Sequence, residues 1–475
     1  MKKTKIICTV GPASNNAEVL EKMILAGMNI ARLNFSHGTT DEHRDNFNLI
    51  KAVSAKTGMH IAILMDTQGP EIRTGRFIDQ EIFLVEGQRY TLTSRDIIGD
   101  ATISNISYKE LSLYVKPGDR ILIDDGLIEL TVIEVLGEDI SCIVLNSGIL
   151  KNNKGINVPG VKTSLPDVSE KDYADILFGI ENDVDFIAAS FIRNAYNIDE
   201  IRKILKENHG SHIRIIAKIE TMEGVDNIDE IIVAADGIMV ARGDLGVEIP
   251  MEEVPLMQKK IIKKCNFAGK PVITATQMLD SMMRNPRPTR AEVADVANAI
   301  FDGTDGIMLS GETASGRYPV ESVQRMYAIA LAAEDDMDYE ALLMEKNRIK
   351  DTSITDAIGY ATCTSATGLA ATAILTPTTS GHTPMVVSKF RPKTPIIATT
   401  TTERTARRLA IAWGVYPIVI KQYGDAKEQL DHSVTAALEA GFIKDKDLVV
   451  ITAGAPMGIE GNTNMLRVHV VGKEI

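Results

Sequence analysis

Eight short apolar runs of strand length alternate with helix-like stretches along this chain, and this repetition constrains the fold more than any other feature. The runs lie at residues 5–10, 29–35, 60–66, 185–191, 214–220, 237–244, 271–277 and 306–312. The nearly uninterrupted apolar run at 61–65 suits a strand that is buried on both faces, as strands are in a parallel sheet. Eight such strands alternating with helices predict a (β/α)8 barrel.

The alternation is interrupted between residues 70 and 167, where strands and turns follow one another with little helical periodicity. A turn at 116–119 precedes a strand-like stretch at 120–135, and a second turn at 137–139 precedes another at 140–145. We therefore predict that residues 70–167 form an inserted all-β barrel domain, a lid. The (β/α)8 barrel would then consist of residues 1–69 and 168–345.

An acidic stretch at 334–338 marks a second boundary, near residue 345. After it, an alanine-rich helix is predicted at 355–373, and strands alternating with helices are predicted at 395–399, 416–420 and 448–452. These features predict a separate C-terminal α/β domain at 346–475.

The chain carries 51 Lys and Arg residues against 64 Asp and Glu residues, a formal net charge of −13. This balance is unfavourable for binding nucleic acid or an anionic membrane surface, because both are polyanions. The four cysteines, Cys8, Cys142, Cys265 and Cys363, are too far apart for a zinc or redox motif. No run of about 18 apolar residues is present, and the apolar run after the basic opening ends too early, at Gly11, for a signal peptide. We therefore expect a cytoplasmic protein that binds neither nucleic acid nor membrane.

Polar residues follow most of the predicted barrel strands, which is where (β/α)8 enzymes carry their catalytic groups. They are Arg32, Asn34, Ser36 and His37 at the second strand, Asp66, Thr67, Glu71 and Arg73 at the third, Lys218 and Glu220 at the fifth, Arg242 and Asp244 at the sixth, Thr276 at the seventh, and Ser310 and Glu312 at the eighth. Because these strand ends meet at one end of a barrel, the sequence predicts an active site there.

Lys218 and Glu220 alternate with Ile219, so both side chains are expected to point to the same side of their strand. A buried lysine is costly unless it is paired, and an ion pair at the barrel rim is one interpretation that the pattern leaves open. With Asp244 one strand away, two carboxylates could hold a divalent cation while Lys218 faces the ligand. Oxygen ligands without His or Cys favour Mg²⁺ or Mn²⁺ over zinc.

A second group of oxygen atoms comes from Asn34, Ser36, Asp66 and Thr67 on adjacent strand ends. One acid among neutral oxygens suits a monovalent cation such as K⁺, but the residues alone favour a network of capping and turn hydrogen bonds. His37 lies before Gly38 in a polar loop, and we interpret it as a residue of that loop rather than an acid–base group. The chain has no phosphate-binding P-loop and no protein-kinase motif set.

With these motifs in view, the sequence resembles the pyruvate kinase family. The segment 215–221, around Lys218, matches that family's signature at its active-site lysine. Further matching blocks lie in the family's order at 28–38, 66–75, 241–250, 275–279 and 308–314, and the similarity extends from about residue 4 to residue 471. The resemblance implies phosphoryl transfer from phosphoenolpyruvate to ADP, giving pyruvate and ATP, with Mg²⁺ (or Mn²⁺) and K⁺.

The resemblance also implies a role for each residue of the predicted site. Lys218, Arg32 and Thr276 would be catalytic, with Lys218 stabilising the transferring phosphoryl group and Arg32 reaching its phosphate. The substrate would also contact Gly243 and Asp244, Mg²⁺ would be held by Glu220 and Asp244, K⁺ by Asn34, Ser36, Asp66 and Thr67, and nucleotide by Arg73, Lys154, Asn34 and His37. The β domain would close as a lid over the site and exclude water.

Two positions near the third strand refine this expectation. Glu71 stands where the family's K⁺-dependent members carry glutamate, so K⁺ dependence is expected. Gln68 stands where many members carry lysine, which removes a positive charge near the nucleotide, so the nucleotide affinity of those members is not expected for this chain.

The C-terminal domain resembles the family's regulatory domain. Its phosphate-effector loop would be formed by Thr376, Thr378, Thr379, Ser380 and Gly381. His382 stands where members activated by fructose bisphosphate often carry arginine, so the effector could be fructose bisphosphate, AMP or another sugar phosphate. Trp413, the only tryptophan, is expected to report effector binding more than substrate binding. The family also implies a homotetramer.

Two other functions remain compatible with parts of the pattern. One is a Mg²⁺-dependent aldolase or lyase that forms a pyruvate enolate on the same kind of barrel, although such an enzyme needs no K⁺ cluster or lid. The other is a sugar-phosphate sensor without catalysis, against which the intact Lys218, Glu220, Asp244 and Thr276 count.

Overall fold

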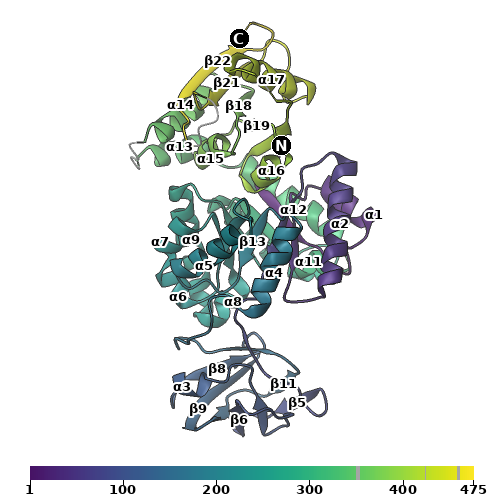
Figure 1. Ribbon diagram of the computed structural model, residues 1–475, viewed down its shortest axis with the longest axis vertical. Helices are drawn as coiled ribbons and strands as arrows, with labels where there is room; N and C mark the ends of the chain where they lie inside the picture. Colours follow the sequence, from purple (N-terminus) through teal and green to yellow (C-terminus); the bar gives the residue numbers. More distant parts are fainter. Residues whose placement is uncertain (349–352, 423, 457–460, 475) are drawn as a thin grey trace.

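The computed structural model describes residues 1–348, 353–422, 424–456 and 461–474, and these form three parts stacked along the long axis of the molecule (Figure 1). A (β/α)8 barrel lies in the middle, with the β domain at one end of it and the C-terminal domain at the other. Among these residues, no helix combines the length and the hydropathy that crossing a bilayer requires.

The eight predicted strands close into a barrel in which each strand is parallel to its neighbours. They are β1 (Lys5–Thr9), β2 (Ile30–Asn34), β3 (Ala62–Asp66), β13 (Phe186–Ala189), β14 (Arg214–Ile219), β15 (Gly237–Ala241), β16 (Val272–Ala275) and β17 (Gly306–Leu309). Nearly every residue of these strands is buried, as a parallel sheet covered on both faces requires. The predicted barrel is therefore confirmed.

The helices of the barrel pack outside the strands. They are α1 (Ala17–Leu25), α2 (Thr40–Thr57), α4 (Glu170–Glu181), α5 (Ala195–Glu207), α6 (Met222–Asp226), α7 (Ile228–Ala234), α8 (Arg242–Glu248), α9 (Val254–Ala268), α10 (Arg290–Phe301), α11 (Gly311–Ala314) and α12 (Pro319–Asp335), with 3₁₀ turns at Met251–Glu253 and Asp280–Met283. Capping boxes fix the starts of α2, α4, α5 and α10. Side chains of Leu20, Ile50, Ile198 and Ile261 pack from these helices against the outer faces of the strands.

Each of the eight strands is shorter than the run that predicted it, and two of them end three residues early. The runs at 237–244 and 306–312 leave the sheet at Ala241 and Leu309, because the short helices α8 and α11 begin immediately afterwards. Asp244 therefore lies in the first turn of a helix and not on a strand.

The β domain contains a seven-stranded sheet in the order β4-β12-β8-β9-β10-β6-β7 and a two-stranded sheet of β11 and β5. Its elements are β4 (Ile72–Arg73), β5 (Glu81–Leu84), β6 (Arg89–Thr93), β7 (Ile103–Asn105), α3 (Leu111–Tyr114), β8 (Arg120–Ile123), β9 (Ile128–Leu136), β10 (Asp139–Val144), β11 (Gly148–Lys151) and β12 (Gly155–Asn157). A bridge between Thr74 and Ile106 links the two edges of the larger sheet, which has its own core. The domain is mostly β, as predicted, with the short helix α3 in addition. Its limits at 70 and 167 stay a prediction.

The C-terminal domain is a five-stranded sheet in the order β20-β19-β18-β21-β22, parallel except for β22. Its elements are α13 (Tyr339–Arg348), α14 (Ile354–Gly368), β18 (Ala373–Pro377), α15 (His382–Lys389), β19 (Ile396–Thr400), α16 (Glu403–Arg408), a 3₁₀ turn (Leu409–Ile411), β20 (Val415–Val419), α17 (Ala426–Glu439), β21 (Leu448–Ala453) and β22 (Met465–Val470). The predicted helix at 355–373 was too long, because α14 ends at Gly368 and Ala373 begins β18. Strands β18 and β22 were not predicted.

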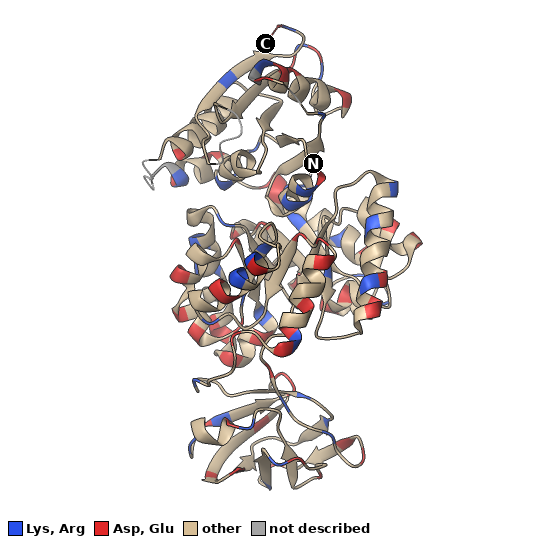
Figure 2. Cartoon of the chain, viewed as in Figure 1, with Lys and Arg blue, Asp and Glu red and all other residues tan. Residues whose placement is uncertain are grey.

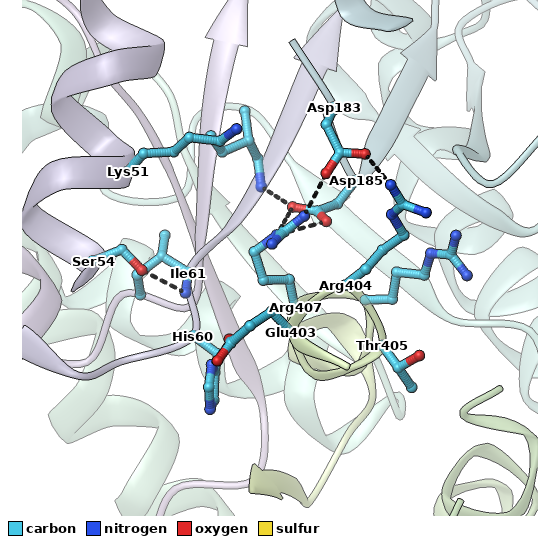
Figure 3. A network of polar contacts seen from close by, with 12 residues as sticks. Lys51, Ser54, His60, Ile61, Asp183, Asp185, Glu403, Arg404, Thr405 and Arg407 are labelled. Atoms are coloured by element: carbon cyan, nitrogen blue, oxygen red, sulfur yellow. Dashed lines mark hydrogen bonds and ion pairs between the residues drawn. The ribbon is translucent and has the colours of Figure 1, made fainter. Parts of the chain in front are cut away.

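An ion-pair network holds α16 of the C-terminal domain against the start of β13 (Figure 3). Arg407 Nε lies 2.9 Å from Asp185 Oδ1, and Arg407 Nη2 lies 3.1 Å from Asp183 Oδ2. Arg404 Nη2 also reaches Asp183 Oδ1, at 2.8 Å. Asp185 Oδ2 accepts a hydrogen bond from the Ile63 amide at 2.9 Å, so one carboxylate joins α16 to both β3 and β13. Burial raises the pKa of Asp185 to about 6 even though Arg407 opposes the rise.

Candidate active site

The predicted site residues of the barrel lie at the carboxyl ends of its strands, at the end of the barrel that meets the β domain. In the view of Figure 2, acidic residues are frequent at this end of the barrel. The site is built from β2, β3, β13, β14, β16 and α8, so its side chains come from segments far apart in the sequence.

Lys218, the penultimate residue of β14, is buried, and its ammonium group contacts three oxygen atoms. Its Nζ lies 3.0 Å from Asp66 Oδ1, 2.9 Å from Glu220 Oε1 and 2.7 Å from Ser190 Oγ. Burial alone would lower the pKa of Lys218, but the charges of Asp66 and Glu220 raise it above its ordinary value. The ammonium group therefore keeps its charge inside the barrel rim.

Asp66 links Lys218 to Arg32 at the end of β3. Arg32 Nε donates to Asp66 Oδ2 at 2.6 Å, and Arg32 Nη1 donates to Thr9 Oγ1 at 2.9 Å. Burial favours the protonated form of Asp66, but Arg32 and Lys218 overcome this and hold its pKa below the ordinary value. A single carboxylate thus orients two cationic side chains.

Glu220 and Asp244 follow the adjacent strands β14 and β15. Glu220 Oε2 accepts a hydrogen bond from the Phe191 amide at 2.6 Å. Burial raises the pKa of Glu220 to about 7, with Asp244 adding to the rise and Lys218 opposing it. Glu71, Asp125 and Glu248 also have raised pKa values, in each case chiefly through burial and in part through the negative charge of Asp244. This concentration of carboxylates around Asp244 favours the binding of a cation.

The carboxylates of Glu220 and Asp244 suit Mg²⁺ better than a metal ion whose ligands all come from protein side chains. Within the described ranges, no group of three or more His, Cys, Asp or Glu side chains is arranged to hold a metal ion. Mg²⁺ is commonly bound by one or two carboxylates, with substrate phosphates and water as the other ligands. Glu220 and Asp244 fit this pattern.

Gly243 and Thr276 form one hydrogen-bonded unit beside Asp244. The Gly243 amide donates to Thr276 Oγ1 at 2.7 Å, and Thr276 Oγ1 donates to the Ala275 carbonyl at 2.6 Å. Thr276 has φ of 71° and Gln277 has φ of 55°, backbone angles that are costly for residues other than glycine. Arg242 Nη2 donates to the Thr276 carbonyl at 2.8 Å and so supports this strained turn.

The predicted K⁺ ligands lie at the ends of β2 and β3, where Asn34 is the register partner of Asp66. Asn34 Oδ1 accepts a hydrogen bond from the Ser36 amide at 3.2 Å. Thr67 is buried, and its Oγ1 accepts from the Ser190 amide at 3.2 Å. The group offers neutral oxygens and the Asp66 carboxylate, which already accepts from Arg32 and Lys218. Such a set suits a monovalent cation better than a divalent one. Part of it also forms the turn network that the residues alone favoured.

The predicted nucleotide residues lie on both sides of the junction between barrel and lid. Arg73 Nε donates to Glu71 Oε2 at 2.6 Å, and Lys154 Nζ lies 2.8 Å from Asp124 Oδ1. The Thr74 amide donates to the Lys154 carbonyl at 2.8 Å, and the Lys154 amide donates to Thr74 Oγ1 at 2.9 Å, so Arg73 and Lys154 are held near each other. His37 is exposed; partial burial lowers its pKa, and the charges of Arg73 and Arg32 lower it further.

The lid contacts the barrel at α8. Asn157 Nδ2 donates to Glu248 Oε1 at 2.8 Å, and the lid turn at Gly126 faces Val247. Asp244 lies on the same helix, α8, one turn before Glu248.

The predicted effector loop lies between β18 and α15. Thr378 Oγ1 accepts from the Gly381 amide at 3.0 Å, and the Thr379 carbonyl accepts from Thr405 Oγ1 of α16 at 3.0 Å. Gly381 has φ of 91° and caps α15, so Ser380 and Gly381 stand at a helix amino terminus. Thr376 is a buried residue of β18 whose hydroxyl donates to the Ile397 carbonyl at 3.3 Å.

Two hydroxyl groups of the site were not predicted, and one acid that follows a predicted strand lies apart from it. Ser190 and Thr9 contact Lys218 and Arg32 directly, and both follow or end barrel strands, so the rule that identified the other residues could have found them. Glu312, in contrast, is buried and accepts from the Leu279 and Ser310 amides at 2.9 and 2.8 Å. It fixes two loops and does not face the cluster around Lys218.

Comparisons with known proteins agree over the whole chain. A family model described as the pyruvate kinase barrel domain matches residues 1–323, and one described as the pyruvate kinase alpha/beta domain matches residues 356–469. A pyruvate kinase of Clostridium acetobutylicum is 53% identical over 472 residues, covering 99% of this chain and 100% of that protein. One of Geobacillus stearothermophilus is 54% identical over 472 residues, covering 99% of this chain and 80% of that protein. The crystal structure of a pyruvate kinase from Cryptosporidium parvum matches with a TM-score of 0.93 and 40% identity, covering 99% of this chain and 96% of the other.

Proposed function

The chain belongs to the pyruvate kinase family and transfers the phosphoryl group of phosphoenolpyruvate to ADP, giving pyruvate and ATP in glycolysis, and we propose that the buried charge cluster around Lys218 carries this reaction. The aldolase or lyase and the non-catalytic sensor are not favoured, because relatives about half identical over the full chain are pyruvate kinases. The observation that carries the assignment of the site is the contact of Lys218 Nζ with both Asp66 and Glu220 at the rim of the barrel.

Lys218 and Arg32 supply positive charge where the phosphoryl group passes between the two substrates. Phosphoryl transfer depends on positioning and on stabilisation of the equatorial oxygens more than on covalent catalysis. Asp66 holds both cations in place before substrate binds, since its two oxygens accept from one each. We propose that Arg32 contacts the phosphate of phosphoenolpyruvate and that Lys218 contacts the group in flight.

An enzyme of this family needs a divalent metal. We propose that Glu220 and Asp244 hold Mg²⁺, or Mn²⁺ in its place, which polarises substrate oxygens as a Lewis acid. Gly243, Asp244 and Thr276 would line the substrate beside it. Phosphoryl transfer leaves the enolate of pyruvate, which must be protonated. Because the Thr276 hydroxyl donates its proton to the Ala275 carbonyl, a water molecule near Thr276 is our candidate for the proton donor.

Asn34, Ser36, Asp66 and Thr67 are our proposed K⁺ ligands, with Glu71 as the residue that accompanies K⁺ dependence. Arg73 and Lys154, together with Asn34 and His37, would bind the nucleotide phosphates. The contact of the lid with α8 supports closure over this site, which would keep water from intercepting the phosphoryl group.

We further propose that the loop at Thr376, Thr378, Thr379, Ser380 and Gly381 binds a phosphorylated effector. The Thr379 carbonyl bonds to Thr405 on α16, and α16 also carries Arg404 and Arg407 of the ion-pair network. Effector binding would therefore act on a helix that is ion-paired to the start of β13, whose other end leads to Ser190 and Lys218. A homotetramer and a cytoplasmic location complete the proposal.

A metal titration tests the assignment of the carboxylates. We expect Glu220→Gln and Asp244→Asn each to raise the Mg²⁺ concentration for half-maximal activity at least about tenfold, because each removes a charged oxygen ligand. The matched control is Glu252→Gln, which changes an exposed glutamate in the 3₁₀ turn after α8 that lies outside the carboxylate cluster. An unchanged Mg²⁺ requirement in both site variants would contradict the assignment.

A further inference from the structure

Phe191, in the turn that follows β13, has a backbone angle that is costly for a bulky residue. Its φ is 55°, in the left-handed region that glycine favours. A residue other than glycine keeps such an angle where the surrounding structure determines it, and such residues gather at functional sites. The turn begins with Ser190, which contacts Lys218, so the strained residue stands at the edge of the proposed active site.

The backbone amide of Phe191 holds the carboxylate of Glu220. It donates to Glu220 Oε2 at 2.6 Å. The other oxygen of the same carboxylate, Oε1, lies 2.9 Å from Lys218 Nζ. Because Glu220 is only 1% exposed, these two donors set the orientation of its carboxylate.

The direction of this amide and the angle φ of Phe191 are set together. The amide belongs to the peptide plane between Ser190 and Phe191. If this plane turns over by about 180° while the chain on either side stays in place, φ of Phe191 becomes negative and the N–H points away from Glu220. A residue that disfavours positive φ at this position therefore favours a state in which Glu220 has lost a donor.

Close packing on both sides holds the turn in its strained conformation. On one side, a Cβ atom on Gly69 would come within 2.7 Å of Phe191 Cδ2. Gly69 is itself fixed, because its amide donates to Oδ1 of the buried Asp172 at 3.0 Å. On the other side, a Cβ atom on Gly224 of α6 would come within 2.6 Å of the Ile192 carbonyl oxygen. The turn is thus enclosed by two neighbouring loops, which is the condition under which a strained residue persists.

We propose that Phe191 is a positioning residue for the divalent metal, because its backbone amide holds the Glu220 carboxylate in the orientation that binds the cation. Phe191 acts through Glu220 and does not contact the metal itself. This role rests on the proposed function, since it takes Glu220 as a metal ligand. The backbone angle at residue 191, and not the size of its side chain, then decides the metal affinity.

The test measures Mn²⁺ binding to the full chain without substrate, from the electron paramagnetic resonance signal of the free ion. Phe191→Gly should retain the affinity within about threefold, because glycine adopts positive φ readily. Phe191→Val should weaken binding at least about fivefold, because a β-branched residue disfavours this angle and the carboxylate then loses a donor. Phe191→Ala, for which the angle costs less than for valine, should fall between the two.

This order is the reverse of the one that side-chain packing would give, because glycine removes the whole side chain and valine keeps part of its apolar volume. The Mg²⁺ concentration for half-maximal activity should follow the same order. The matched control is His209→Val, which places valine at an exposed position with φ of 61° between α5 and β14, at the other end of the barrel. Its Mn²⁺ affinity should equal that of the parent.

Glu220→Gln in the same assay separates this role from the metal assignment on which it rests. If Glu220→Gln binds Mn²⁺ as well as the parent, the assignment of Glu220 to the metal fails, and the role of Phe191 fails with it. If Glu220→Gln weakens binding but Phe191→Val and Phe191→Ala do not, the role of Phe191 alone is refuted. Weaker binding in Phe191→Gly than in Phe191→Val or Phe191→Ala would also refute it.

Discussion

Replacing Lys218 with methionine removes the central charge of the proposed active site while keeping a side chain of similar length. Methionine cannot donate to Asp66, Glu220 or Ser190, which Lys218 Nζ contacts at 3.0, 2.9 and 2.7 Å. Loss of one preorganised electrostatic donor costs about 10²–10³ in turnover, or about 3–4 kcal/mol of transition-state stabilisation. We expect kcat to fall by at least this factor.

The structure also predicts what the same substitution does to stability. Breaking a buried ion pair costs about 3–5 kcal/mol, because it leaves a charge uncompensated. Here Asp66 keeps Arg32 and Glu220 keeps the Phe191 amide, so we expect the lower part of that range and a protein that still folds.

Activity is followed as pyruvate formation, with kcat and KM for phosphoenolpyruvate measured separately, and folding by circular dichroism and melting temperature. Lys22→Met is the control, since Lys22 is an ion-paired lysine of α1 outside the site and should retain kcat. Near-normal kcat in folded Lys218→Met would refute the role of Lys218. A loss of kcat of the same size in Lys22→Met would show that the effect is not specific to the site.

Three further changes test other parts of the account. Ser190→Ala removes one of the three contacts of Lys218, so we expect kcat to fall about tenfold with little change in melting temperature. An unchanged kcat would show that Ser190 does not position Lys218. Glu71→Lys should reduce the dependence of activity on K⁺, measured with K⁺ replaced by a large organic cation, and full retention of the dependence would contradict the interpretation of that position. The fold raises the pKa of Asp185 from 3.8 to about 6. Between these two pH values the folded state holds a proton that the unfolded state has lost. The free energy of unfolding therefore falls by about 3 kcal/mol as the pH rises from 3.8 to about 6. Asp185→Asn should therefore show a smaller drop in apparent melting temperature than the parent between pH 4 and pH 6.5, and identical pH profiles would contradict the burial argument.

The barrel was predictable because each of its strands carries a local signal. Runs such as 61–65 are apolar without interruption, and helices between them begin with capping residues such as Thr39 and Thr289. The strand-end rule then placed Lys218, Glu220 and Asp66 together although they are far apart in the chain, and the structure brings them within hydrogen-bond distance.

The errors arise where local pattern and tertiary packing disagree. Asp244 was placed on a strand because it closely follows the apolar run at 237–241, yet the chain turns into α8 at Arg242. The helix predicted at 355–373 ran too far because alanine suits both the end of α14 and the buried start of β18. Nothing local marked the antiparallel edge strand β22, whose exposed and buried residues follow no clean alternation.

A cavity of about 790 Å³ between the barrel and the C-terminal domain, lined in part by Trp413, could not be predicted from sequence patterns. It is formed by helices of the barrel together with Lys346, Arg391 and Trp413, which are separated by tens of residues and meet only when two domains dock. Ser190 was missed for a different reason: it directly follows β13, so the strand-end rule applied to it as it did to the other site residues, but it was not singled out there.

The measurement that tests the central claim most directly is pyruvate formation from phosphoenolpyruvate and ADP by the purified chain with Mg²⁺, with and without K⁺. The account predicts activity that requires both ions, because Glu220 and Asp244 are assigned to Mg²⁺ and the group at Asn34, Ser36, Asp66 and Thr67 to K⁺. Activity with Mg²⁺ that is indifferent to K⁺ would contradict the cation-site assignment. No activity under either condition, even with sugar phosphates or AMP added, would contradict the assignment of the site as a whole.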